Sequence, residues 1–212
     1  LPVAPDLVPE PETTAQDVID ALGDAVVLKP VGQGSALGVR FGCGAASIGA
    51  LLEAVRGTPP GSWLLERRIF GRELTVGVLD PEGQAPQALP VVEIETPDES
   101  WYDYEHRYTP GLSTHRLPAP VPDAIARAAG ETAVAAHRAL GCRDLSRADF
   151  LLDASGTLVL LEVNTLPGMT PTSLYPDGAA AISTDDSRVV GSVDSLSTFD
   201  APTTAAPAVT ST

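Results

Sequence analysis

The sequence predicts an α+β fold, and three observations support that class. Residues 45–57 space their apolar side chains with the period of an amphipathic helix. Residues 122–141 carry a proline suited to a first helical turn and a glycine suited to a helix end. Residues 147–164 read as two apolar strands around the turn at Ser155 and Gly156, which indicates antiparallel pairing.

Composition limits the classes of partner. The 212 residues could form one large domain or two small ones. A formal charge of −15 disfavours nucleic acid and anionic membranes, and no stretch has the length of a membrane span, so we expect neither partner. Cys43 and Cys142 lack metal-ligand spacing, and we expect two reduced thiols in a cytoplasmic protein.

The first third of the chain alternates helices and strands. Residues 1–12 are proline-rich and predict an extended lead-in. Thr13 or Thr14 can cap a helix over 15–23, which a glycine ends. Residues 25–30 are a short apolar run typical of a buried strand.

The middle of the chain predicts more strands. We expect strands at 62–69 and 72–80, joined by a turn at Gly71, and another at 87–95. Residues 96–121 show neither helical nor strand periodicity. They carry three of the four tyrosines, which favours a functional lid over a disordered segment. Residues 177–212 are rich in Ser, Thr, Ala and Asp, so we expect them to be disordered.

The hairpin at 147–164 carries a candidate metal site. If Asp153 pairs with Leu158, then Asp149 faces Glu162 and Arg147 faces Asn164, all on one side of the sheet. The other side would then carry four apolar residues, namely Phe150, Leu152, Leu161 and Val163. Opposed carboxylates repel unless a cation lies between them, and oxygen ligands suit Mg²⁺ or Mn²⁺. A solvated polar face is the alternative, and the Gly/Pro/Thr/Ser loop at 164–174 favours the metal.

The single lysine, Lys29, stands between an apolar strand and a glycine-rich loop at 32–38. The loop fits neither the dinucleotide-binding fingerprint nor the P-loop, because its third glycine is displaced and no Gly-Lys-Ser/Thr follows. What remains is a backbone able to close on an anion beside a compact positive charge. A plain hairpin loop would explain the glycines but not the position of the lysine.

Five segments, in this order, resemble D-alanine–D-alanine ligases of the ATP-grasp superfamily. They are "VVLKPVGQGSALGV", "LERRIFGRELTVGVL", "WYDYEHRY", "LSRADFLLD" and "LEVNTLPGMTPTSLYP". The resemblance covers residues 1–176. It implies an ATP-grasp fold, in which two α+β subdomains enclose ATP, with the family's N-terminal substrate domain lying outside this chain.

The resemblance also implies a reaction and its binding residues. ATP would phosphorylate one D-alanine, and the amine of a second would attack the acyl phosphate, for peptidoglycan precursor synthesis. ATP would be bound through the phosphates by Lys29 and at the base and ribose by Glu66, Arg67, Ile69 and Glu73. Two Mg²⁺ or Mn²⁺ ions would be held by Asp149, Glu162 and Asn164.

Other matching residues would act on the substrates. By resemblance, Arg147 stabilises the transferring phosphate and the tetrahedral oxyanion. Ser35 and Tyr108 would close the active site, and Arg107 would reach the nucleotide phosphates where the family usually has a lysine. The second D-alanine would be held by Gly168, Ser173 and Leu174.

Two alternatives remain open beside the ligase. One is a non-catalytic fragment that binds Mg·ATP, and the other is an ATP-grasp ligase with a different acceptor, such as D-lactate. A homodimer of the full-length protein is also an expectation of the resemblance.

Overall fold

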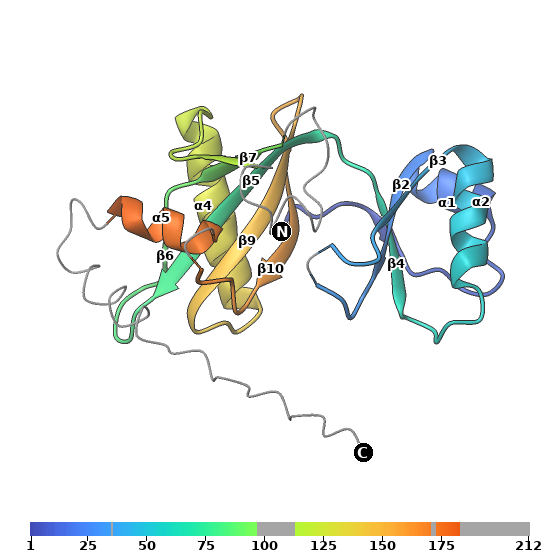
Figure 1. The fold of residues 1–212 in the computed structure, drawn as a ribbon, viewed down its shortest axis with the longest axis horizontal. Helices are drawn as coiled ribbons and strands as arrows, with labels where there is room; N and C mark the ends of the chain where they lie inside the picture. Colours follow the sequence, from blue (N-terminus) through green and yellow to red (C-terminus); the bar gives the residue numbers. More distant parts are fainter. Residues whose placement is uncertain (35, 97–112, 171–172, 183–212) are drawn as a thin grey trace, which may run out of the picture.

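The computed structural model describes residues 1–34, 36–96, 113–170 and 173–182, which form two α+β lobes (Figure 1). The small lobe is built mainly from residues 6–67 and the large lobe from residues 71–182. Within the described residues no helix combines the length and the apolar character needed to cross a membrane.

The small lobe is a four-stranded antiparallel sheet covered by two helices. Its strands lie in the order β1 (Asp6–Leu7), β4 (Trp63–Arg67), β2 (Ala25–Pro30) and β3 (Arg40–Cys43). The helices are α1 (Ala15–Leu22) and α2 (Gly44–Val55). The four apolar residues that the helical spacing selects in α2 are all buried: Ile48, Leu51, Leu52 and Val55.

Helix α1 begins at a capping box. The Thr14 hydroxyl accepts from the Asp17 N–H at 3.2 Å, and the Asp17 carboxylate accepts from the Thr14 N–H at 2.9 Å. Each side chain satisfies a backbone donor that the helix leaves unpaired. Thr14 is therefore the cap, and Gly23 ends the helix at φ +91°, a backbone conformation that favours glycine.

The large lobe is a six-stranded antiparallel sheet. Its main order is β10 (Leu158–Asn164), β9 (Asp144–Asp153), β5 (Gly71–Asp80), β7 (Val92–Glu95) and β8 (Thr114–Arg116), and β6 (Gln87–Ala88) pairs with β5. Helix α4 (Asp123–Ala139) packs on one face through Ala129, Ala133 and Ala136. On the other face, Tyr175 of α5 (Leu174–Ile182) packs against Leu79.

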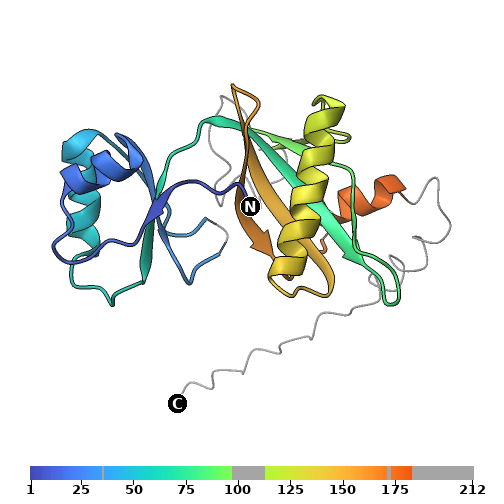
Figure 2. The same ribbon diagram turned by 180° about the vertical axis from the view of Figure 1, so that it is seen from behind.

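Within the part of the chain that the structure describes, two segments join the lobes. Residues 68–70 connect β4 to β5, so the expected turn at Gly71 is wrong: the two strands lie in different sheets, and Gly71 begins β5. A second connection is the N-terminal segment, in which Pro2 accepts from the Leu160 N–H of the large lobe at 2.7 Å before β1 pairs with β4 (Figure 2). The lead-in is extended, as predicted.

Three other boundaries differ from the sequence predictions. The strand expected at 87–95 is split into β6 and β7 around Pro90, which has no N–H to donate to a ladder. The segment 96–121 was expected to be an irregular lid throughout, but it contains strand β8. Residues 97–112 of this segment lie outside the described residues. The prediction that residues 177–212 are disordered is wrong for residues 177–182, because α5 continues to Ile182.

Candidate active site

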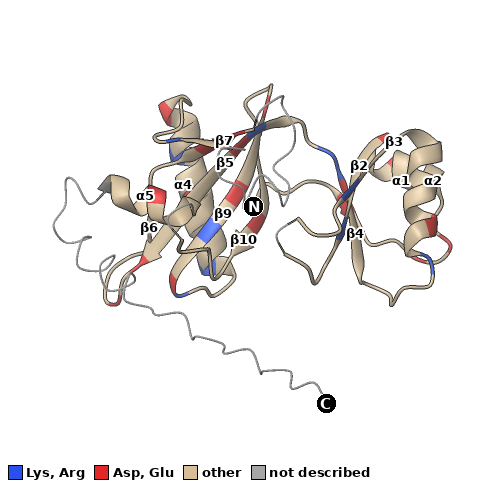
Figure 3. Cartoon of the chain, viewed as in Figure 1, with Lys and Arg blue, Asp and Glu red and all other residues tan. Residues whose placement is uncertain are grey.

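A cavity of about 1020 Å³ lies between the lobes. Strands β2 and β4 contribute its small-lobe wall through Val27, Lys29 and Glu66, residues 68–70 line its back, and β5, β7, β9 and β10 contribute the opposite wall. Acidic and basic residues lie next to one another on β9, and the segment that joins the lobes carries a basic residue (Figure 3). Nearly all the described residues of the predicted nucleotide and metal sites line this one cavity.

Lys29 forms an ion pair with Glu66. Its Nζ lies 2.7 Å from Glu66 Oε1, and both side chains are partly buried. Val27 pairs with Glu66 in the β2–β4 ladder, so the lysine reaches diagonally across two neighbouring strands. The two side chains predicted to bind opposite ends of ATP are thus neighbours on one wall.

Three of the predicted base- and ribose-binding residues lie on or close to the segment that joins the lobes. Arg67, Ile69 and Glu73 all line the cavity. The Arg67 N–H donates to the Pro5 carbonyl at 2.9 Å, and its Nε donates to the Leu22 carbonyl at 2.8 Å. Arg67 therefore fixes the end of β4 to the lead-in segment and to the end of α1.

A cation–π stack between Arg68 and two phenylalanines is a feature that the sequence analysis missed. The Arg68 guanidinium carbon lies 4.4 Å from the ring centre of Phe41 and 4.5 Å from that of Phe70. All three side chains line the cavity. Phe41 is on β3 and Phe70 is on the connecting segment, so the stack ties the small-lobe sheet to the junction between lobes.

An ion pair also stands at the edge of the cavity. Arg72 donates to Glu93 through Nε at 2.5 Å and Nη2 at 2.8 Å. The hydrogen bond to Glu93 raises the pKa of Arg72, against the opposing effect of burial. The pair joins β5 to β7 and keeps both charges compensated on this wall.

The predicted register of the hairpin is right at the end that carries the candidate metal site and wrong next to the turn. Asp149 pairs with Glu162 and Arg147 with Asn164, as expected, but Leu158 pairs with Leu152 instead of Asp153. A β-bulge between Leu160 and Glu162 absorbs the one-residue difference.

The bulge also changes which face Leu161 occupies. Leu161 lines the cavity together with Glu162, whereas the predicted alternation placed it on the opposite face. Phe150 and Leu152 are buried in the core under α4, as predicted, and Val163 packs against that core. Leu161 and Leu151 from the large lobe, with Val27 from the small lobe, give the cavity apolar surface on both walls.

Asp149 is the centre of a hydrogen-bonded cluster. Its Oδ1 accepts from Arg147 Nε at 2.8 Å and from the Thr75 hydroxyl at 2.6 Å. Its Oδ2 accepts from Arg147 Nη2 at 2.7 Å and from Asn164 Nδ2 at 3.1 Å. Asn164 Nδ2 also lies 3.4 Å from Glu162 Oε1. The fold brings all four predicted residues together and adds Thr75, which alternation alone did not identify.

The donor set suits a hard divalent cation that also has other ligands. Among the described residues no three His, Cys, Asp or Glu side chains gather to hold a metal ion by themselves. Asp149 and Glu162 supply two carboxylates and Asn164 an amide, on one face of one hairpin. Mg²⁺ is commonly bound by one or two carboxylates plus waters and substrate phosphates, so the residues fit such an ion beside a nucleotide.

The predicted acceptor-binding loop is compact. The Ser173 hydroxyl oxygen lies 2.8 Å from the position that a Cβ on Gly168 would take, and 2.8 Å from the Thr170 hydroxyl. Leu174 is buried against Val92 and Ile94. The loop therefore brings Gly168 and Ser173 together and buries Leu174 at the start of α5. Ser35, Arg107 and Tyr108 lie outside the described residues.

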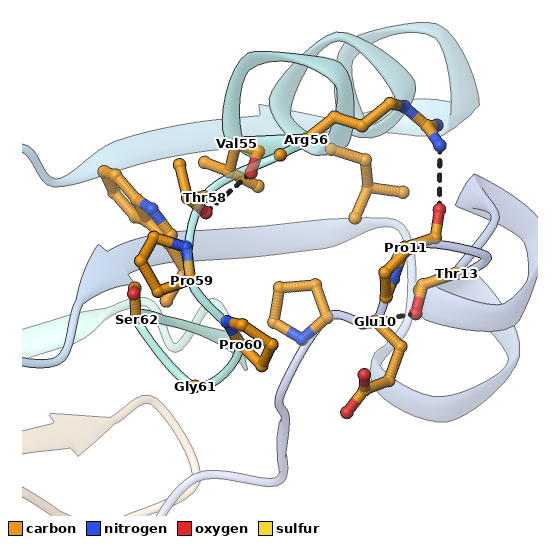
Figure 4. Close-up of a pocket in the computed structure, with 14 residues that line it drawn as sticks. Glu10, Pro11, Thr13, Val55, Arg56, Thr58, Pro59, Pro60, Gly61 and Ser62 are labelled. Carbon is orange, nitrogen blue, oxygen red and sulfur yellow. Dashed lines mark hydrogen bonds between the residues drawn. The ribbon is translucent and has the colours of Figure 1, made fainter.

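A second, much smaller cavity of about 40 Å³ lies in the small lobe, away from the cleft (Figure 4). Prolines, Val55 and Trp63 contribute to its lining, and Arg56 Nη1 donates to the Pro11 carbonyl at 2.7 Å beside it. Thr58 donates to the Val55 carbonyl at 2.7 Å. These contacts close the end of α2, and we assign them a structural role.

A known protein family matches most of this chain. The family described as "D-ala D-ala ligase C-terminus" matches residues 4–192. A D-alanine–D-alanine ligase of Anaeromyxobacter dehalogenans (strain 2CP-C) is 44% identical over 156 residues, which are 74% of this chain and 48% of that protein. The chain spans about half the length of the curated relatives it matches.

Solved structures of D-alanine–D-alanine ligases superpose on most of this chain. The D-alanyl-alanine synthetase A of Vibrio cholerae superposes with a TM-score of 0.75 at 25% identity, over 93% of this chain and 61% of that chain. A Bacillus anthracis D-alanine–D-alanine ligase complexed with ATP gives a TM-score of 0.65 at 26% identity, over 91% and 59%. The predicted α+β, ATP-grasp class is confirmed.

Proposed function

This chain belongs to the D-Ala-D-Ala ligase C-terminus family, and on that premise we propose that it is the nucleotide-binding part of an ATP-dependent D-alanine–D-alanine ligase. The γ-phosphoryl group of ATP passes to the carboxylate of one D-alanine. The amine of the second D-alanine then attacks the acyl carbon, phosphate leaves, and the products are D-alanyl-D-alanine, ADP and phosphate. The observation that carries the proposal is the cleft, whose lining includes all the described residues predicted to bind ATP and two of the three predicted metal ligands, Asp149 and Glu162.

The residues that line the cleft favour one orientation of the nucleotide. Its apolar surfaces at Val27, Leu151 and Leu161 suit the faces of a purine ring. Glu66 accepts from the adenine amino group, and Glu73 accepts from the ribose hydroxyls. Lys29 directs its ammonium group toward the phosphates, which requires it to share or release its contact with Glu66.

Asp149, Glu162 and Asn164 would hold two Mg²⁺ or Mn²⁺ ions. When bound, such ions neutralise charge on the transferring phosphoryl group. The residues of the chain contribute position: Asp149 is fixed by several donors, and Glu162 lies directly across the ladder from it. Arg147 supplies a positive charge from the same face, suited to phosphate oxygens and to the tetrahedral oxyanion.

The remaining parts of the proposal concern substrate, location and assembly. Gly168, Ser173 and Leu174 hold the second D-alanine at the loop before α5. The dipeptide serves peptidoglycan precursor synthesis, and thereby cell-wall formation and cell shape. We place the protein in the cytoplasm, where ATP is available, and propose a homodimer for the full-length protein.

The test is D-alanine-dependent release of phosphate from ATP by the full-length protein. We expect phosphate release with D-alanine and a product with the mass of the dipeptide. D-lactate and D-serine, supplied as acceptors together with D-alanine, should give little mixed product. ATP binding without phosphate release would contradict the ligase and leave a nucleotide-binding protein, whereas a mixed product in excess would contradict the D-alanine acceptor.

A further inference from the structure

The carboxylate of Asp149 has no spare acceptor position. Each of its oxygens accepts two hydrogen bonds: Oδ1 from Thr75 and Arg147, and Oδ2 from Arg147 and Asn164. A carboxylate oxygen has two lone pairs in its plane. A cation that binds Asp149 must therefore displace one of these donors.

The donors differ in their freedom to leave. Thr75 pairs directly with Asp149 in the β5–β9 ladder, is 1% exposed, and approaches the carboxylate at 2.6 Å. A hydroxyl has one proton, and its other acceptor, the Ala148 carbonyl, is more distant at 3.3 Å. Withdrawing Thr75 would leave a buried hydroxyl poorly paired.

Arg147 is also buried, at 8% exposed, but it has a long side chain with several rotatable bonds. It lies two residues before Asp149 on the same strand face, where a long side chain can turn from its neighbour into the cleft. Its guanidinium fork binds carboxylate and phosphate with the same geometry, so phosphate oxygens can replace both bonds that it gives up. Asn164 can turn its amide toward Glu162, from which it is already 3.4 Å.

We propose that Asp149 is held in place by Thr75 and exchanges Arg147 for a divalent cation, so that cation binding releases Arg147 to the nucleotide phosphates. This inference rests on the proposed function of the cleft. Thr75 is then a positioning residue that acts through Asp149. The exchange makes cation and phosphate binding mutually favourable, because each binds a partner that the other sets free.

Titration of Mn²⁺, followed by the electron paramagnetic resonance signal of the free ion, tests the exchange without reference to turnover. Removing the competitor in Arg147→Met should raise Mn²⁺ affinity roughly tenfold, the equivalent of a charged hydrogen-bonded contact. ADP should then enhance Mn²⁺ affinity by a smaller factor in this variant than in the wild type. Thr75→Val should lose roughly tenfold or more in Mn²⁺ affinity, and Thr75→Ser should retain it.

A matched control separates competition from general charge repulsion. Arg68 lines the same cavity but its guanidinium stacks on Phe41 and Phe70, so Arg68→Met should leave Mn²⁺ affinity within about twofold of the wild type. An equal gain in Mn²⁺ affinity in the two variants that lose a positively charged side chain would overturn the exchange. So would an unchanged Mn²⁺ affinity in Arg147→Met. Equal affinity in Thr75→Val and Thr75→Ser would overturn the positioning role. A wild type that binds neither Mn²⁺ nor ADP would refute the proposed function itself, and the exchange with it.

Discussion

The Arg147–Asp149 pair should contribute strongly to stability as well as to binding. The two side chains are only 10% and 12% exposed and share two hydrogen bonds. In Asp149→Asn the buried guanidinium loses its charged partner, and one of its N–H groups faces an amide NH₂. Breaking a buried pair in this way costs about 3 kcal/mol in the free energy of unfolding. For a chain of this size the loss corresponds to a fall of roughly 10 °C in melting temperature.

A double variant makes the reasoning refutable. Arg147→Met/Asp149→Asn removes both charges, so it should be clearly more stable than Asp149→Asn alone. Urea denaturation of the wild type, both single variants and the double variant gives the coupling energy between the two side chains. A loss below about 1 kcal/mol in Asp149→Asn, with no recovery in the double variant, would show that the ion pair contributes little.

Three further variants test the junction, a helix end and the metal site. Gly71→Ala would place a Cβ 2.3 Å from the Leu152 carbonyl oxygen, so it should lower the urea midpoint by separating β5 from β9, and an unchanged midpoint would contradict that packing. Thr14→Ala should cost about 1 kcal/mol of unfolding free energy. The hydrogen bond from the Thr14 hydroxyl, which the variant removes, lowers the pKa of Asp17, so the part of the stabilisation that comes from this bond is present above the ordinary pKa of an aspartate and is lost as pH falls through the lowered value; a wild-type minus variant difference that does not shrink in acid would contradict it. Glu162→Gln should abolish Mg²⁺-dependent nucleotide binding in equilibrium titrations, and near-wild-type affinity would mean that the metal site lies elsewhere.

Local pattern was enough to predict most elements. The pairing of Asp149 with Glu162 and of Arg147 with Asn164 was predicted from a register that is one residue off at the turn, and it is correct because the bulge between Leu160 and Glu162 compensates for that difference. The bulge at Leu161 could not be predicted in this way, because it depends on how β10 packs against β9 and α4 and not on its own period. Thr75 was missed for a related reason, since it lies on a third strand that is distant in sequence.

The division into two lobes also required the tertiary structure. A short break between two strands reads as a hairpin turn, yet residues 68–70 lead from one sheet to another. Nothing local distinguishes the two outcomes, because both need a strand to end and another to begin. The helix beyond residue 177 was missed because its sequence is poor in large apolar residues, whereas Tyr175 and Ala179 bury it against the sheet.

The most direct test of the central claim is a crystal structure of the full-length protein with Mg²⁺ and a non-hydrolysable ATP analogue. The account predicts the purine between Val27 and Leu161, the phosphates beside Lys29, and metal ions on Asp149 and Glu162 with Arg147 turned to the phosphates. A nucleotide bound outside the cleft, or metal ions that do not contact the hairpin, would contradict it.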